Sequence, residues 1–137
     1  MGDYSAYFVM AGGPPSNSAA NLHWRKKKKQ KDHWFAMVRA ELGSNIPPDP
    51  LKHARVTITR HSNKPLDGDN LHHGAKYILD ALTKCGVIED DKHHVIGMPN
   101  VRWMQFRHPG VRTSVCVTEC RPDELDSSAW IYEGGEG

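Results

Sequence analysis

The sequence is poor in cysteine and has no long hydrophobic segment. Only three of its 137 residues are cysteines. An odd and sparse set of this kind is atypical of a disulfide framework, so we expect a reducing, cytoplasmic environment. No apolar run approaches the roughly 20 residues that a membrane-spanning helix requires, so no membrane partner is expected. The first ten residues lack a basic region followed by a long apolar stretch, and we expect no signal peptide.

Two other kinds of signal are missing. The sequence contains neither a glycine-rich dinucleotide motif nor a P-loop, so no organic cofactor is expected. It also contains no internal repeat of the kind that builds solenoids or propellers. A chain of 137 residues with 38% hydrophobic residues can form one modest core. We therefore expect a single small domain.

The net charge of +2 conceals an uneven distribution. Residues 1–64 hold 11 Lys and Arg against 4 Asp and Glu, whereas residues 65–137 hold 7 against 12. Six basic residues fall within seven consecutive positions, namely Arg25, Lys26, Lys27, Lys28, Lys29 and Lys31. Such a run can displace counterions from phosphates, which predicts salt-dependent DNA binding. The alternative is a solvated loop without a partner.

Hydrophobic periodicity predicts six elements. Alternating or short apolar runs indicate strands, and apolar residues three or four apart indicate helices. The order is β-α-β-α-β-β, over residues 6–10, 34–42, about 55–59, 71–82, 95–106 (with a break near Pro99-Asn100) and 111–117. In the second helix, Leu71, Ala75, Ile78 and Leu82 share one side.

This order predicts an α/β (α+β) fold with a mixed sheet of about four strands and two helices. We place the domain at residues 1–120. Residues 121–137 hold five acidic residues and one arginine, and we expect them to form a loose acidic tail. Within this tail, Trp130-Ile131-Tyr132 could dock elsewhere on the protein.

Acidic residues concentrate in two of the predicted connections. Asp67-Gly68-Asp69 precedes the second helix, and Glu89-Asp90-Asp91 follows it. Like charges at close range are unfavourable unless a cation offsets them. Mg²⁺ prefers hard oxygen ligands and needs few protein carboxylates. The pattern therefore favours a metal site, although Asp69 could instead cap the helix in a solvated turn.

These residues carry a resemblance to a known family. The chain is similar to the RusA family of Holliday-junction resolvases in Asp67-Gly68-Asp69-Asn70-Leu71, Lys76, Asp80-Ala81-Leu82, Gly86-Val87-Ile88 and Asp90-Asp91. Pro14-Pro15-Ser16-Asn17 resembles the N-terminal motif of the family. The match runs in order from about residue 8 to residue 120.

The resemblance implies a small homodimeric, Mg²⁺-dependent endonuclease that cuts four-way DNA junctions symmetrically. Mn²⁺ is a possible substitute. Such enzymes occur in bacterial cytoplasm or in phage-infected cells, where they serve DNA recombination and repair. Asp67, Asp69 and Asp91 resemble the catalytic metal-binding carboxylates, and Asp90 is a further metal-ligand candidate. Lys76 resembles the active-site lysine. The DNA-binding set comprises the basic run, Asn17 and His73.

Two spacings depart from the family pattern. His72-His73-Gly74-Ala75 separate the Asp-Asn pair from Lys76, so His73 occupies the position nearer to that pair. Val95 lies one residue later after Asp91 than the pattern implies, which leaves either Asp90 or Asp91 as the principal ligand. Two alternatives therefore stay open. One is a less selective nuclease acting on forks, flaps or duplex DNA, and the other is a DNA-binding dimer that does not cut.

Overall fold

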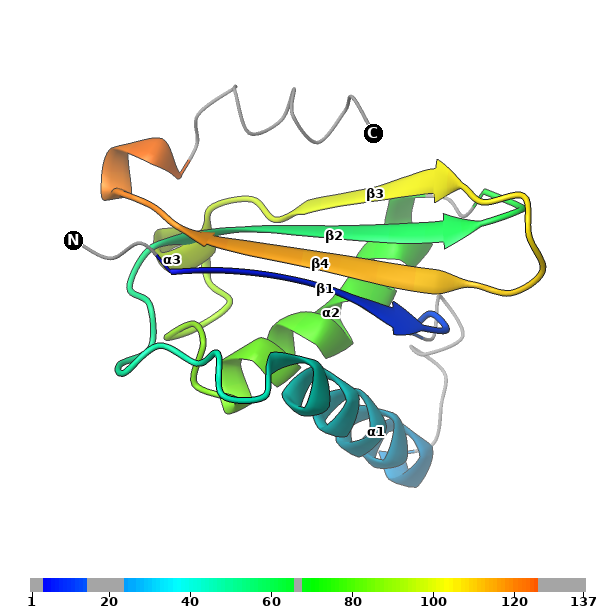
Figure 1. Cartoon of the computed structure of the whole chain (residues 1–137), viewed down its shortest axis with the longest axis horizontal. Helices are drawn as coiled ribbons and strands as arrows, with labels where there is room; N and C mark the ends of the chain where they lie inside the picture. Colours follow the sequence, from blue (N-terminus) through cyan, green and yellow to red (C-terminus); the bar gives the residue numbers. More distant parts are fainter. Residues whose placement is uncertain (1–3, 15–23, 66–67, 126–137) are drawn as a thin grey trace.

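A computed structural model describes residues 4–14, 24–65 and 68–125, with the side chains of residues 68–70 left aside. Four strands form one mixed sheet in the order β1-β4-β2-β3, and the helices precede or connect them (Figure 1). This confirms the predicted fold class. The elements are β1 (Ser5–Ala11), α1 (Trp24–Leu42), β2 (Ala54–Ser62), α2 (Gly68–Lys84), α3 (His93–Ile96), β3 (Asn100–Gln105), β4 (Arg112–Glu119) and the 3₁₀ helix η2 (Pro122–Glu124).

The last strand lies inside the sheet. β4 pairs antiparallel with β1 on one side and with β2 on the other. β3 pairs parallel with β2 at the edge, with Ile58 opposite Val101. Parallel neighbours need a crossover connection, and α2 supplies it between β2 and β3. The crossover therefore fixes α2 against one face of the sheet.

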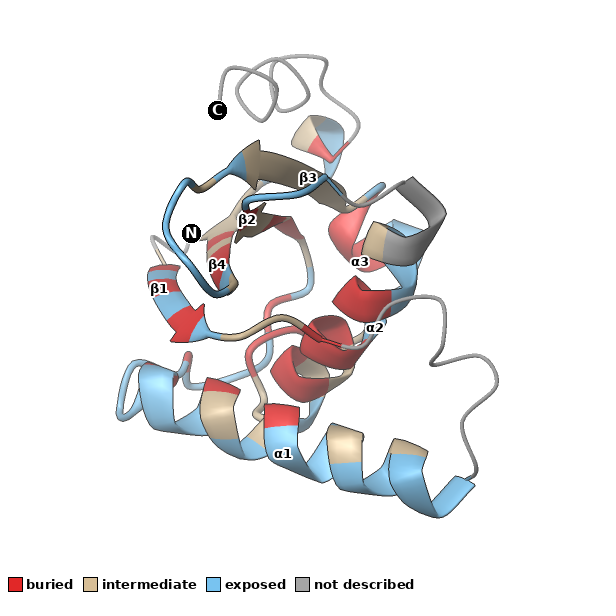
Figure 2. Ribbon diagram, turned by 90° about the vertical axis from the view of Figure 1, so that its right-hand side faces the viewer, coloured by how far each residue is buried: buried red, intermediate tan, exposed pale blue. Residues whose placement is uncertain are grey.

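Side chains of alternating strand residues enter the core from that face. In β1, Ala6, Phe8 and Met10 are buried while their neighbours are exposed. The helices α1 and α2 cover the same side, as Figure 2 shows. The buried stripe of α1 is Trp34, Val38 and Leu42, within the predicted helix over residues 34–42. In α2 the buried residues include Ala75, Ile78 and Leu82, as predicted.

Two element boundaries differ from the predictions. The first helix begins at Trp24 rather than Trp34, so the basic run is helical and the loop alternative is wrong. The predicted strand over residues 95–106 forms only from Asn100, because residues 93–96 form the helical turn α3. This turn buries both Val95 and Ile96, whereas adjacent residues of a strand would point to opposite faces.

The C-terminal segment is partly folded. Pro122–Glu124 form η2, and Leu125 is 7% exposed. Arg55 holds this segment, because its Nη1 donates to the carbonyl oxygens of Ile96 and Leu125, both at 2.8 Å. Residues 121–125 thus belong to the folded body rather than to a loose tail. The rest of the predicted tail, residues 126–137, lies outside the described residues.

The structure also bears on membrane crossing and on the cysteines. Within the described parts of the chain, no helix has the length and apolar character that crossing a membrane requires. Cys85, Cys116 and Cys120 are free and partly buried, and none of them forms a disulfide.

Candidate functional site

The described part of the candidate site centres on Lys76 and Asp91. Lys76 lies on the outer side of α2, and its Nζ donates to the Asp91 carboxylate. The same ammonium lies 3.6 Å from an oxygen of Asp80, one helical turn further on. Lys76 thus contacts two carboxylates, one on its own helix and one beyond the end of that helix.

The turn after α2 brings Asp91 back toward the helix. Gly86 adopts a φ of 84°, a conformation that favours glycine, and it reverses the chain there. Val87 and Ile88 are then fully buried, and their backbone pairs with Leu51. The hydrogen bond from the Glu89 N–H to the Leu51 carbonyl is 3.0 Å long. These contacts fix the direction in which residues 89–91 leave the core.

Asp90 lies next to Asp91 and supports it. The backbone N–H of Asp91 donates to Asp90 Oδ1 at 2.7 Å. The hydrogen bond from Lys76 is the main cause that lowers the pKa of Asp91, and the same bond raises the pKa of Lys76. Both groups are therefore charged at neutral pH, so the site presents an ammonium beside the Asp91 carboxylate.

The other two predicted catalytic carboxylates cannot be placed beside this pair. Asp67 lies outside the described residues, and only the backbone of Asp69 is described, in the first turn of α2. Helical geometry puts position 69 on the same side of α2 as position 76, about 10 Å away along the axis. Among the described residues, no three His, Cys, Asp or Glu side chains form a metal-binding group. The predicted four-carboxylate metal site therefore stays a prediction.

The described donors fit a hard cation. Asp90 and Asp91 are consecutive carboxylates that line one hollow, and oxygen is the ligand that Mg²⁺ and Mn²⁺ take most readily. Lys76 occupies one oxygen of Asp91. We therefore expect a bound cation to share Asp91 with Lys76 or to displace it.

A groove between α1 and α2 runs beside the acidic residues. It has a volume of about 460 Å³ and is lined by Lys27, Lys31, His72, His73, Lys76, Tyr77 and Asp80. A neighbouring hollow shares Lys31, Tyr77 and Asp80 with it and continues to Asp90 and Asp91. The cations of α1 and the acids that follow α2 thus border one continuous surface.

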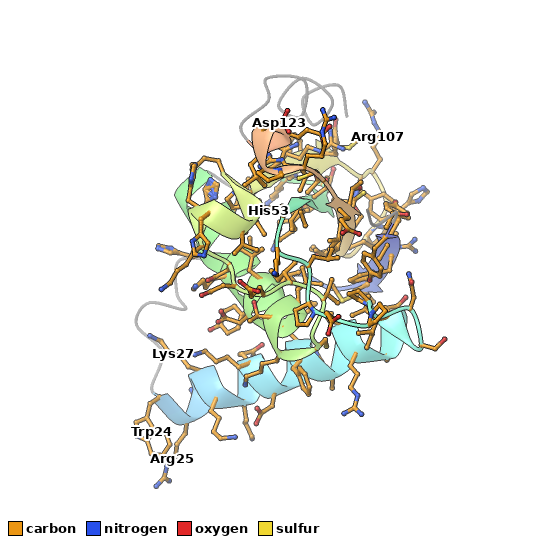
Figure 3. All side chains as sticks on the ribbon, turned by 90° about the vertical axis from the view of Figure 1, so that its left-hand side faces the viewer. Trp24, Arg25, Lys27, His53, Arg107 and Asp123 are labelled. Carbon is orange, nitrogen blue, oxygen red and sulfur yellow. The ribbon has the colours of Figure 1, made fainter. Side chains whose placement is uncertain are left out.

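The basic run is divided among the sides of α1. Only Lys27 and Lys31 line the groove, and Figure 3 shows Lys27 on the side of α1 that faces α2. Lys28 pairs with Asp32 at 2.9 Å, and Arg25 stacks over Trp24 with 5.2 Å to the ring centre. Lys26 and Lys29 are exposed on other sides of the helix. Of the remaining predicted DNA contacts, His73 lines the groove, and Asn17 lies outside the described residues.

Two residues at this surface have no role that the sequence predicts. Asp80 was part of the family resemblance, but its contact with Lys76 was not predicted. The signal was present, because residues four apart on a helix are neighbours. Tyr77 lines both hollows, yet its place follows only from the packing of α1 on α2, which no local pattern shows.

Comparisons with known proteins add little. No protein-family model matches the chain, and a search of the curated proteins finds no match. Among solved structures, CetZ1 from Haloferax volcanii, a GDP-bound monomer, matches with a TM-score of 0.32 and 13% sequence identity. That match covers 96% of this chain but only 34% of the CetZ1 chain. A similarity this low carries no argument about fold or function.

Proposed function

We propose that this protein is a metal-dependent endodeoxyribonuclease of the RusA type, which resolves four-way DNA junctions by paired symmetric nicks. One observation carries the proposal. The Lys76–Asp91 pair, which joins two motifs of the resemblance, borders a groove whose other side is lined by Lys27 and Lys31 of the basic helix. Acids that suit a cation and bases that suit a phosphate backbone thus lie on one surface.

The groove side chains would bind and orient the DNA strand. Lys27 and Lys31 would contact phosphates that flank the scissile bond, giving affinity without base specificity. Lys76, kept protonated by Asp91, would donate to a non-bridging oxygen of the scissile phosphate. His73 lines the same groove and is the second candidate for this contact. Asp91 would orient Lys76 when no cation is bound.

We infer that Asp67, Asp69 and Asp91, with Asp90 beside them, hold Mg²⁺ or Mn²⁺. When bound, such an ion would offset charge on the phosphate and make water a stronger nucleophile. A single site cuts one strand, so resolution of a junction needs two sites related by a two-fold axis. A homodimer supplies that symmetry. Proteins of this kind act on DNA in the bacterial cytoplasm or in a phage-infected cell.

The decisive experiment compares two variants, each of which replaces a carboxylate in the same connection by the corresponding uncharged amide. Asp91→Asn removes the carboxylate that contacts Lys76. Glu89→Gln removes an exposed carboxylate from the same connection and serves as the matched control. Both are incubated with a labelled four-way junction, with and without Mg²⁺. We expect Asp91→Asn to lose cleavage by a factor on the order of 10² or more while it still binds the junction, and Glu89→Gln to cut like the unmodified chain.

Other outcomes would favour the alternatives. Equal cleavage of a four-way junction and of linear duplex would favour a less selective nuclease. Binding that survives EDTA, with no products in Mg²⁺ or Mn²⁺, would favour a DNA-binding dimer that does not cut. Asp69→Asn is the second test, because full cleavage by that variant would contradict the metal-site assignment.

A further inference from the structure

The two long helices cover only one face of the sheet. α1 and α2 pack against the face that bears Phe8 and Ile58 (Figure 2). The opposite face, here called the open face, consists of the odd-numbered residues of β1 and β2 and the even-numbered residues of β3 and β4. It includes the two exposed apolar residues of β1, Tyr7 at 69% and Val9 at 40%. The two side chains are neighbours on this face, because they lie two residues apart in one strand.

The open face is also positively charged. It bears Arg102 and Arg112, and none of its strand positions holds an acidic residue. Arg102 is held by a 3.0 Å hydrogen bond from its Nε to Thr59 Oγ1. Its Nη1 is shielded from solvent and has no acceptor in the described part of the chain. A partner that supplies carboxylates would complement this face.

The chain itself leads to one corner of the open face. Arg55 is the first open-face residue of β2, and its Nη1 holds the Leu125 carbonyl oxygen at 2.8 Å. The twelve residues that follow, 126–137, contain Asp126, Glu133 and Glu136 and no basic residue. They also contain the apolar run Trp130-Ile131-Tyr132. Their composition is therefore the complement of the open face in both respects.

The length of this segment suits the distance. Residues two apart on a strand are about 6.8 Å apart, so the open face from Arg55 to His61 spans about 20 Å. An extended chain advances up to about 3.4 Å per residue, so Trp130 can reach about 17 Å beyond Leu125. The apolar run can therefore reach the middle of the face, and the two C-terminal glutamates can reach the arginines beyond it.

We propose that residues 126–137 dock on the open face, with Trp130-Ile131-Tyr132 against Tyr7 and Val9 and the acidic side chains beside Arg102 and Arg112. The inference is independent of the proposed nuclease activity, because it involves the opposite side of the sheet. It also assigns a role to the acidic tail, which the nuclease site does not use.

Cys116 reports on this docking directly. It lies on the open face, opposite Tyr7 in the register of β1 and β4. Cys85 follows α2 and packs against the core cluster. The experiment measures the rate at which a maleimide labels each cysteine, in a Cys120→Ser background that leaves Cys116 as the only cysteine of its tryptic peptide. Cys85 is the internal control for global opening.

The matched comparison is between the full chain and a chain that ends at Leu125. If the segment is docked nine-tenths of the time, labelling of Cys116 should be about tenfold faster in the shortened chain. The rate for Cys85 should not change. Equal rates for Cys116 in the two chains would overturn the proposal.

Full-length variants separate the two contributions and remain informative if the shortened chain does not fold. Trp130→Ala with Ile131→Ala should raise the Cys116 rate toward that of the shortened chain. Glu133→Gln with Glu136→Gln should also raise the labelling rate of Cys116. Added salt should raise the rate of the unmodified chain in the same way. If Cys116 protection instead depends on protein concentration, and persists in the shortened chain, a second copy covers this face and the proposal is wrong.

Discussion

Lys76 of α2 contacts the carboxylate of Asp91, which lies 15 residues further along the chain, after the turn that ends the helix. The two side chains differ in accessibility, with Lys76 60% exposed and Asp91 only 17%. The lysine can therefore reach a substrate while the aspartate remains partly shielded behind it.

Replacement of Lys76 by Met should reduce cleavage far more than it reduces stability. An exposed ion pair contributes about 1 kcal/mol or less to the free energy of unfolding. Loss of a donor to the scissile phosphate lowers the rate by a factor on the order of 10². Junction-cleavage kinetics and urea denaturation measure the two effects. Lys52→Met, which removes an exposed ammonium outside the groove, is the control. Unimpaired cleavage by Lys76→Met would point to His73 instead.

The two groove lysines of α1 should differ from their neighbours on the same helix. Lys27→Gln with Lys31→Gln removes two cations from the groove, whereas Lys26→Gln with Lys29→Gln removes two exposed cations from other sides. Each phosphate contact contributes about 0.9 to the slope of log affinity against log salt concentration. We therefore expect the groove pair to reduce that slope by about 2 and the other pair to change it little. Equal effects of the two pairs would mean that DNA does not follow the groove.

Ile78 should be essential for the stability of α2. Its side chain is fully buried, at 0% exposure, between the helix and the sheet. Ile78→Ala should lower the free energy of unfolding by about 3 kcal/mol, because it removes buried methyl groups and leaves a cavity. His72→Ala, at an exposed position of the same helix, should change it by about 0.5 kcal/mol or less. Urea denaturation monitored by circular dichroism measures both, and a similar loss in the two variants would contradict the placement of Ile78.

His61 should make the protein less stable as the pH falls. Burial lowers the pKa of its ring, and the neighbouring Arg102 lowers it further. The ordinary value is 6.5, so below about that pH the unfolded chain binds a proton that the native state resists. The free energy of unfolding then decreases until the native pKa is reached. The melting temperature of His61→Gln should fall less than that of the unmodified chain between neutral pH and about pH 5. NMR titration of the ring checks the direction of the shift.

The core could be predicted from local pattern, whereas the extent of α1 could not. Trp34, Val38 and Leu42 indicate a helix because they recur at helical spacing. The preceding lysines have no such apolar stripe, yet lysine is a good helix former. The Lys28–Asp32 pair, four residues apart, adds local support. Helix propensity and charge pairing therefore extend the helix toward the N-terminus. Hydrophobic periodicity does not detect either of these contributions.

The candidate site was predictable as a set of residues but not as an arrangement. The acidic motifs on either side of α2 indicated that carboxylates would gather there. The contact of Asp91 with Lys76 depends on the Gly86 turn and on the pairing of Leu51 with the backbone at Val87 and Glu89, contacts distant in sequence. Likewise, only the packing of α1 on α2 selects Lys27 and Lys31 from a uniform run of cations. The local sequence pattern does not predict such contacts between segments that are distant in sequence.

The central place of β4 determines when this protein can fold during synthesis. β1 and β2 do not pair with each other, because β4 lies between them. In a nascent chain that ends before Arg112, β1 therefore has no strand to pair with. The sheet on which α1 and α2 pack is then incomplete. Such non-local pairing forms late, because the intervening chain must first be ordered. The basic helix thus emerges from the ribosome well before the sheet on which α1 and α2 pack is complete.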